Sequence, residues 1–342
     1  MGWLIGIDEA GYGPNLGPLT IGGSLWQTTP FDRGGADDLF ALLAPQIGSV
    51  ASSDSARWLA VDDSKRLYAP QSGLAPLERV ALGASFSASA ADPAAREARP
   101  RDLEDLSSRW QLSTSSDTAE SAAPLESPLP WYLVPTLLPT AESVPQLDEL
   151  AARFDALTRD RGVALKRVTV ERIEPERFNR EVERWGNKAS LLSLESLRRV
   201  RALLDEIGRV ASDDRSPVLV RCDRHGGRAR YLAVLQQLFP DERIEVLDET
   251  SGLSRYRWSG RRPVEIRFQV GSEQFLETAW ASVVAKYVRE LSIDAFNRFW
   301  IGHLPDLAPT RGYPVDAKRF RGEIEPLARR LAIPAERYWR SR

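Results

Sequence analysis

The stretch Trp3-Leu-Ile-Gly-Ile-Asp-Glu-Ala-Gly-Tyr-Gly13 joins a short apolar run to two adjacent acids and then to a Gly-Tyr-Gly turn. An unbroken apolar run of this length is typical of a buried strand, and the glycines indicate a tight turn after it. In a regular strand Asp8 and Glu9 would point to opposite faces. We therefore expect the strand to stop at this pair, so that both carboxylates reach one site.

Other acids are expected at comparable positions. The mainly apolar stretch 217–222 predicts a second buried strand, and it ends at Asp223. Strand ends share one edge of an α/β sheet, where sites usually form. Glu290 lies on a predicted helix, and Asp294 follows it one turn later as a reserve candidate. For any single acid, an ordinary helix cap or surface ion pair is the alternative interpretation.

Converging carboxylates repel one another unless a cation holds them, and all-oxygen ligands suit Mg²⁺ or Mn²⁺. Two such ions, about 4 Å apart, activate a water molecule and stabilise a leaving alkoxide in phosphodiester hydrolysis. The pattern thus indicates a metal-dependent phosphodiesterase. The chain has only two histidines and one cysteine, so a zinc site built from those residues is not expected.

The order of the predicted elements favours a mixed α/β class. Strand patterns occupy 3–8 and 19–26 early in the chain. Late in the chain, 243–247 and 264–270 alternate like a pair of neighbouring strands. Residues 176–207 are predicted as one long helical stretch, and residues 272–300 as one or two helices.

Composition indicates a soluble globular protein, because 42% of the 342 residues are hydrophobic and 27% are charged. The net charge of -2 is mild evidence against a nucleic-acid binder, although a local basic patch is enough for phosphate contacts. Residues 86–150 carry eleven acids and four arginines, and we expect 86–130 to be an inserted, partly disordered segment open to a protein partner. From residue 311 onward, nine basic residues face four acids in a mostly helical segment.

The single Cys222 excludes an internal disulfide and fits a reducing cytoplasm. The first residues lack the basic and apolar regions of a signal peptide, and no apolar window reaches the length of a membrane span. We expect a cytoplasmic monomer without membrane contacts. His225 is expected to stabilise its loop.

Five segments of this chain resemble motifs of the ribonuclease HII family (type 2 ribonuclease H), and they occur in the family's order. The first, Gly6-Ile-Asp-Glu-Ala-Gly-Tyr-Gly-Pro-Asn-Leu-Gly-Pro18, resembles the family's opening motif, and Ala279-Trp-Ala-Ser-Val-Val-Ala-Lys-Tyr-Val-Arg-Glu290 resembles its long helix. The others are 63–67, 174–189, and 312–315 with 337–340. Only 86–150 and 249–263 have no counterpart and are interpreted as insertions.

The resemblance implies a ribonuclease H-like fold, with a central mixed sheet flanked by helices and a helical C-terminal extension. It implies a catalytic domain over 1–305 and a helical segment over 306–342 that packs on the substrate side. Asp8, Glu9 and Asp223 match the family's metal-binding acids, and Glu290 is aligned with the fourth, which is normally Asp. The implied reaction is hydrolysis of RNA–DNA hybrids, or of DNA at embedded ribonucleotides, with two Mg²⁺ or Mn²⁺ ions, leaving 3′-hydroxyl and 5′-phosphate ends.

The residues that the resemblance assigns to substrate binding are Gly11, Tyr12, Gly13, Lys65, Ser282, Lys286 and Tyr313. The family has a basic residue where this chain has Tyr12, which puts recognition of the RNA–DNA junction in doubt. Two alternatives therefore stay open. One is a related nuclease for DNA junctions or structured RNA, and the other is a non-catalytic nucleic-acid-binding relative.

Overall fold

The computed structural model describes residues 1–29, 38–51, 53–68, 73–86, 99–112 and 128–341. Its strands are β1 (Gly2–Ala10), β2 (Leu19–Thr28), β3 (Ile47–Gly48), β4 (Leu59–Ala60), β5 (Val163–Ile173), β6 (Val218–Asp223), β7 (Glu245–Glu249), β8 (Leu253–Ser259) and β9 (Pro263–Gln269). Its α-helices are α1 (Leu39–Leu43), α2 (Ser64–Leu67), α3 (Ala75–Glu78), α4 (Leu103–Trp110), α5 (Val144–Asp160), α6 (Pro175–Trp185), α7 (Lys188–Val210), α8 (Leu232–Leu238), α9 (Leu276–His303) and α10 (Pro314–Arg330).

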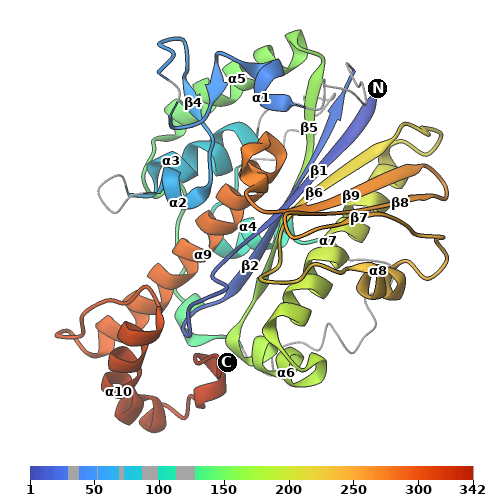
Figure 1. The fold of residues 1–342 in the computed structure, drawn as a ribbon. Coiled ribbons are helices and arrows are strands. Elements are labelled where there is room, and N and C mark those ends of the chain that lie inside the picture. The colour runs from blue at the N-terminus through green and yellow to red at the C-terminus, as the bar shows by residue number, and fades with distance from the viewer. Residues whose placement is uncertain (30–37, 52, 69–72, 87–98, 113–127, 342) are drawn as a thin grey trace.

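A seven-stranded mixed sheet in the order β5-β2-β1-β6-β9-β8-β7 forms the centre of the molecule (Figure 1). Strands β1, β6 and β9 are mutually parallel neighbours, whereas β2 is antiparallel to both β1 and β5. Three parallel strands therefore present their carboxyl ends at one edge. The expected mixed α/β sheet flanked by helices is confirmed.

Each face of the sheet buries its own apolar core because side chains alternate along β1. Leu4 packs with α9 and with the small helices α1, α3 and α4, while Ile5 and Ile7 pack under α7 and α8. Figure 1 shows α9 running obliquely along one face and α7 on the other. The backbone of α9 lies so close to β1 that a Cβ on Gly6 would come within 2.1 Å of the carbonyl group of Glu277. A glycine is therefore required at this crossing.

The chain after α9 forms a third core of its own. Phe296 and Trp300 at the end of α9 pack against Phe320 and Ile324 of α10. Figure 1 shows α10 beyond the far end of α9, with the C-terminus returning towards α6. The helical C-terminal segment is thus present as expected.

Several local expectations are corrected. The helical stretch 176–207 is divided in two, because Gly186 adopts a left-handed conformation (φ 83°) and Asn187 then caps α7 through its side chain. The strand patterns at 243–247 and 264–270 are not partners, since β8 lies between β7 and β9. Of the segment 86–130, which we expected to be partly disordered, residues 87–98 and 113–127 lie outside the described residues, and 103–110 form α4. In the described ranges we find no helix with the length and apolarity to cross a bilayer.

Candidate metal centre

Three neighbouring parallel strands each deliver one acid to the same edge of the sheet. Ile7 of β1 pairs with Cys222 of β6, so the next residues, Asp8 and Asp223, leave adjacent strands on the same face. That face is the one that α9 covers. The chain leaving β9 turns through the left-handed Gly271 (φ 69°) into a short 3-10 helix that contains Glu273.

The three carboxylates form a compact cluster. One oxygen from each of Asp8, Asp223 and Glu273 lies within 4.8 Å of the other two. Asp8 is buried, and the other two are partly buried. Burial, followed by the charges of Glu9, Asp223 and Glu273, raises the pKa of Asp8 well above its ordinary value. Burial also raises the pKa values of Asp223 and Glu273. Without a bound cation, burial and mutual repulsion disfavour the ionised forms of these carboxyl groups.

Asp223 offers one oxygen that no group in the described part of the chain satisfies. Backbone N–H groups of Arg224, Ser272 and Gly271 bond its carboxylate and oppose the pKa rise that burial causes. Its Oδ1, however, is buried and has no hydrogen-bond partner among the residues that the structure describes. The backbone bonds therefore hold the other oxygen and fix the carboxylate, while Oδ1 remains available. An orphaned anionic oxygen beside two further carboxylates fits a hard divalent cation.

Glu9 corrects the expectation that the strand ends at the acid pair. Strand β1 continues to Ala10, and Glu9 is paired in register with Ile21. Glu9 therefore points away from the face that carries Asp8, and it is not part of the close cluster. It remains electrostatically linked, because burial and then the charge of Asp223 raise its pKa to about 7, against the effect of Lys65.

Lys65 supplies the positive charge next to the acids. It lies in α2, whose first turn is capped by the Asp63 side chain. Partial burial disfavours its charge, but Asp63, Asp8, Glu273 and Glu9 outweigh that effect and raise the pKa of Lys65. Its side chain is exposed, which leaves the ammonium group accessible to a phosphate.

Ser282 supports the cluster from α9. It is almost completely buried, its hydroxyl lies 3.0 Å from that of Ser64, and its hydrogen bond to Asp8 favours the ionised form of that acid. Its predicted role in substrate contact stays a prediction. Its contacts position Asp8 and tie α2 to α9.

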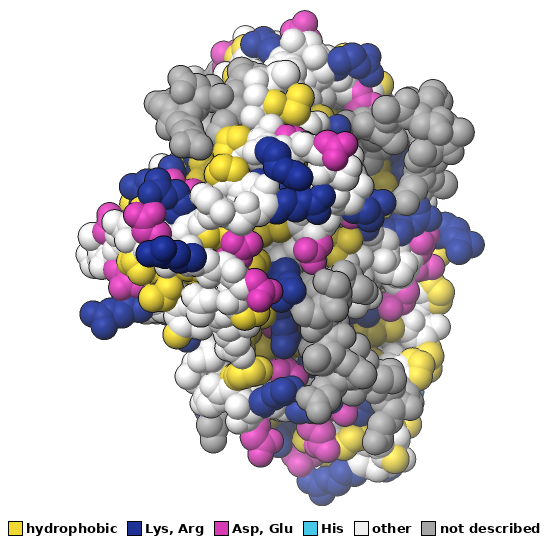
Figure 2. Space-filling model, turned by 90° about the vertical axis from the view of Figure 1, so that its right-hand side faces the viewer, with side chains coloured by type: hydrophobic (Ala, Val, Ile, Leu, Met, Phe, Trp, Pro, Cys, Tyr) yellow, Lys and Arg dark blue, Asp and Glu magenta, His cyan; other side chains and the backbone are white. Residues whose placement is uncertain are grey.

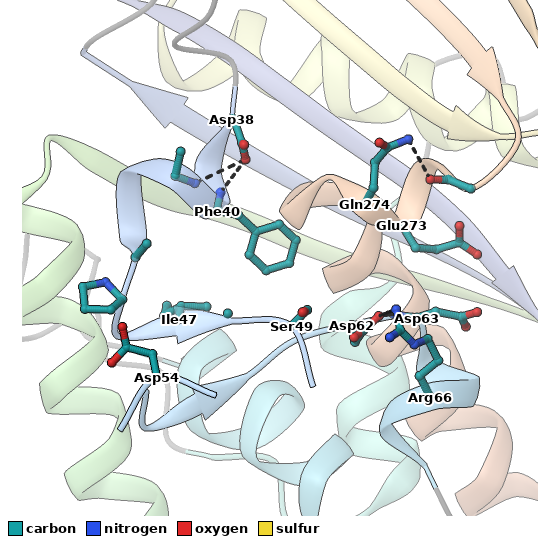
Figure 3. A pocket seen from close by; sticks show the side chains of 15 residues that line it. Asp38, Phe40, Ile47, Ser49, Asp54, Asp62, Asp63, Arg66, Glu273 and Gln274 are labelled. Carbon is teal, nitrogen blue, oxygen red and sulfur yellow. Dashed lines mark hydrogen bonds and ion pairs between the residues drawn. The ribbon is translucent and has the colours of Figure 1, made fainter. Parts of the chain in front are cut away.

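A cavity of about 740 Å³ opens beside Glu273. Figure 3 shows Glu273 and Gln274 on one side of it, and Asp62, Asp63 and Arg66 below. The four aspartates of its wall already accept hydrogen bonds from nearby backbone N–H groups. Asp62, for example, accepts hydrogen bonds from the backbone N–H groups of Val50 and Asp63. The cavity thus extends the space in front of the cluster rather than forming a second acid site.

Glu290 does not join the cluster. Its buried carboxylate accepts bonds from Lys286 at 2.7 Å, from Arg289 at 3.0 Å and from Arg311. Burial opposes ionisation, but these cations prevail and lower the pKa of Glu290. Asp294, the reserve candidate, is exposed and interacts electrostatically with Glu290 and Arg311. Both acids therefore lie in a second, mainly basic group of side chains.

The glycine turn lies beside the metal centre and packs tightly. Gly11 has φ 85°, and a Cβ there would come within 2.4 Å of Arg289 Nε. A Cβ on the exposed Gly13 would meet no atom of the described residues within 4 Å. The Tyr12 ring is partly buried, and Lys188 Nζ lies 4.7 Å from its centroid. Tyr313 is 54% exposed and precedes α10.

His225 is buried, and its ring contacts Ser193, Tyr231 and Phe268. Burial lowers its pKa to about 3. This environment agrees with a role in stabilising the loop.

On the face of the molecule that Figure 2 shows, basic and acidic side chains are interspersed. This distribution agrees with the net charge of -2. Phosphate recognition would therefore depend on a few positioned cations near the acids.

Glu273 is the member of the site that sequence reasoning missed. The rule that selected Asp8 and Asp223 was an acid at the end of a predicted strand. Residues 264–270 were predicted as a strand, and Glu273 follows them by three residues. The same rule therefore pointed to Glu273, but Glu290 was preferred because it is aligned with an acid of the resembled family.

No family model and no curated protein matches this chain. Among solved structures it is similar to ribonuclease HII in the complex with PCNA from Archaeoglobus fulgidus, with 13% identity and a TM-score of 0.37 over 99% of this chain and 94% of that one. It is also similar to ribonuclease H2 from Pyrococcus horikoshii OT3 (13% identity, TM-score 0.37, 98% and 92%). A third match is Bst-RNase HIII in complex with Mn²⁺ (14% identity, TM-score 0.39, 99% and 66%). Likeness at this level is no evidence of shared activity, so function has to be inferred from the residues themselves.

Proposed function

We propose that this protein is a divalent-metal nuclease that hydrolyses the RNA strand of RNA–DNA hybrids, or cuts DNA at embedded ribonucleotides. The observation that carries the proposal is the convergence of Asp8, Asp223 and Glu273 within 4.8 Å, at the ends of three adjacent parallel strands. The motifs around Asp8 and in α9, which resemble ribonuclease HII, support the choice of substrate.

Asp8, Asp223 and Glu273 are the proposed ligands for Mg²⁺ or Mn²⁺, with Glu9 as a neighbour that adds negative charge. When bound, such ions activate a water molecule and stabilise the leaving 3′-oxygen. The chain's own residues then have separate tasks. Ser282 fixes Asp8, backbone N–H groups fix Asp223, and Lys65 binds a phosphate oxygen close to the acids.

In this proposal Glu273 takes the ligand role that the resemblance assigned to Glu290. The Glu290 carboxylate already forms ion pairs with Lys286, Arg289 and Arg311. Binding a metal ion there would cost the free energy of breaking these buried ion pairs. Residues 1–305 would form the catalytic domain, and residues 306–342 would contribute Arg311 and Tyr313 to the substrate side.

A second candidate keeps the chemistry but changes the substrate to a DNA junction or a structured RNA. The observation that favours it is Tyr12, an uncharged, partly buried ring in the Gly-Tyr-Gly turn beside the acids. Tyr12 offers an aromatic face for base or sugar stacking where the resembled family has a cation.

The test is a cleavage panel with four labelled substrates: an RNA–DNA hybrid, a DNA duplex with one ribonucleotide, plain DNA and plain RNA, each with Mg²⁺ and with Mn²⁺. We expect cleavage of the first two substrates only. Asp8→Asn, Asp223→Asn and Glu273→Gln should each lower the rate by more than ~100-fold, because even groups that only support a metal ligand cost 10–100-fold.

The control is Glu290→Gln, which should need no more metal for half-maximal rate than wild type. If Glu290→Gln raised the metal requirement and Glu273→Gln did not, the ligand assignment would be wrong. Preferred cleavage of plain DNA or structured RNA would favour the second candidate. Tight hybrid binding without cleavage under any metal condition would indicate a non-catalytic binding protein.

A further inference from the structure

A second group of charges lies on the same face as the metal centre and is organised around Glu290. This carboxylate is 1% exposed and binds three cations, Lys286 and Arg289 from its own helix and Arg311 from the segment before α10. One buried acid therefore fixes basic side chains from two separate parts of the chain.

Arg311 is the accessible member of this group. Its side chain is 50% exposed, whereas Lys286 is 14% and Arg289 is 1% exposed. The Arg311 guanidinium lies 5.4 Å from the centroid of the Tyr68 ring, and the Lys286 ammonium lies 5.1 Å from the same ring. A guanidinium that rests on an aromatic ring and is held by a buried carboxylate has lost most of its conformational freedom before any ligand arrives.

The position of this group relative to the acids is set by two helices. Ser282, Lys286 and Glu290 follow at intervals of four residues along one side of α9, and Ser282 contacts Asp8. At 1.5 Å per residue, Glu290 lies roughly 12 Å along the helix from Ser282. The one-turn helix α2 also connects the acids to the group around Glu290. Lys65 in this helix lies near the acids, and Tyr68 caps its other end. A nucleic-acid strand whose cleaved phosphate lies at the three acids would thus pass the side of the molecule that carries Tyr68.

We propose that Arg311 binds a backbone phosphate of the nucleic-acid strand, away from the cleaved bond, and that Glu290 is the positioning residue that orients it. The proposal rests on the proposed nuclease function. Arginine suits this task because its planar fork pairs with two phosphate oxygens at once. Asp294, exposed beside Arg311, adds an opposing charge, but the cations of the group outnumber Glu290 and Asp294.

The test measures hybrid binding without cleavage, by fluorescence anisotropy of a labelled RNA–DNA hybrid in EDTA over a range of KCl concentrations. We expect Arg311→Gln to weaken binding several-fold at low salt and to reduce the slope of log affinity against log salt by about 0.9, the loss of one phosphate contact. With Mn²⁺ present, it should raise KM more than it lowers kcat.

The matched control is Arg209→Gln, which removes the same charge from a side chain that is 71% exposed. Arg209 lies at the end of α7, where the chain leads into the start of β6, and so at the sheet edge opposite the acids. We expect wild-type binding, salt slope and KM in this variant.

The role of Glu290 is tested by combining the variants. Glu290→Gln alone should reproduce part of the binding loss, and adding it to Arg311→Gln should produce little further change, because both act through the same contact. If wild type cleaves the hybrid but Arg311→Gln binds like Arg209→Gln, the Arg311 proposal is overturned and the nuclease function stands. If wild type neither binds nor cleaves the hybrid, the proposed function itself fails.

Discussion

At the scale of single residues, the acids of the metal centre destabilise the metal-free protein. Asp8, Glu9, Asp223 and Glu273 all have raised pKa values, and burial is the largest cause for each. A carboxyl group whose pKa is higher in the folded than in the unfolded chain holds a proton that the unfolded chain has already released. The same property that favours metal binding thus reduces stability as the pH rises.

This gives a pH prediction for Glu9, whose pKa rises from 4.5 to about 7 on folding. Its unfavourable contribution is absent below about pH 4.5, grows through the interval and is complete above pH 7, where it amounts to at most ~3 kcal/mol. In EDTA, wild type should lose free energy of unfolding between pH 5 and pH 8, and Glu9→Gln should lose less. Urea unfolding at both pH values measures the difference. An identical loss in the two proteins would contradict the assignment.

At the scale of elements, the site depends on how closely α9 lies on the sheet. Gly6 of β1 and Gly22 of β2 meet the helix backbone directly, since a Cβ would come within 2.1 Å of Glu277 and 2.2 Å of Ala281. The next residue on the same side of β1 is Asp8, which therefore reaches Ser282 on the helix. Small residues on the strands thus allow the contact that orients a proposed metal ligand.

We therefore predict that Gly6→Ala destabilises the protein by ~1–3 kcal/mol or more, because backbone atoms of α9 have to move. Activity at low temperature should fall as well, as Ser282 is displaced from Asp8. Thermal unfolding and a hybrid cleavage assay measure the two effects. Gly322→Ala in α10 is the control, because a Cβ there meets no atom within 4 Å in the described part of the chain. This substitution should be neutral or stabilising by up to ~1 kcal/mol. Equal melting temperatures for Gly6→Ala and wild type would refute the steric argument.

At the scale of the whole molecule, metal binding and folding are coupled. Asp8 is separated by more than two hundred residues from Asp223 and Glu273, so the cluster exists only in the folded chain. A ligand that binds only the folded state stabilises it by about 2.7 kcal/mol at one hundred times its dissociation constant.

We predict that Mn²⁺ or Mg²⁺ raises the melting temperature of wild type in a concentration-dependent manner. Asp8→Asn should melt at or above the temperature of metal-free wild type, because it removes repulsion, and should show little response to metal. Differential scanning calorimetry with metal and with EDTA makes the comparison, and Ca²⁺ tests whether a non-catalytic hard cation acts alike. A full metal response in Asp8→Asn would contradict the site.

The sequence alone determined the elements that depend on local pattern. The runs before Asp8 and Asp223 are both strands, because burial on two faces requires mainly apolar residues. The exception in β6 is the buried Arg221, which forms an ion pair with Glu277 of α9. The sequence also predicted both acids at strand ends and the mixed α/β class. It did not predict the continuation of β1 to Ala10, because nothing in the residues Glu9 and Ala10 reports the pairing with β2.

Only the tertiary structure decided which acids meet. Asp8, Asp223 and Glu273 converge because β1, β6 and β9 are parallel neighbours, a fact of strand order that no local pattern contains. Glu290 instead forms an ion pair with Arg311, and the chain between α9 and α10 places Arg311 next to it. Asp8 and Glu9, although adjacent in sequence, lie on opposite faces of the sheet, with Asp8 on the α9 face and Glu9 on the other. Residue type set the available chemistry, and strand order, with the pleat of β1, set which carboxylates can share a cation.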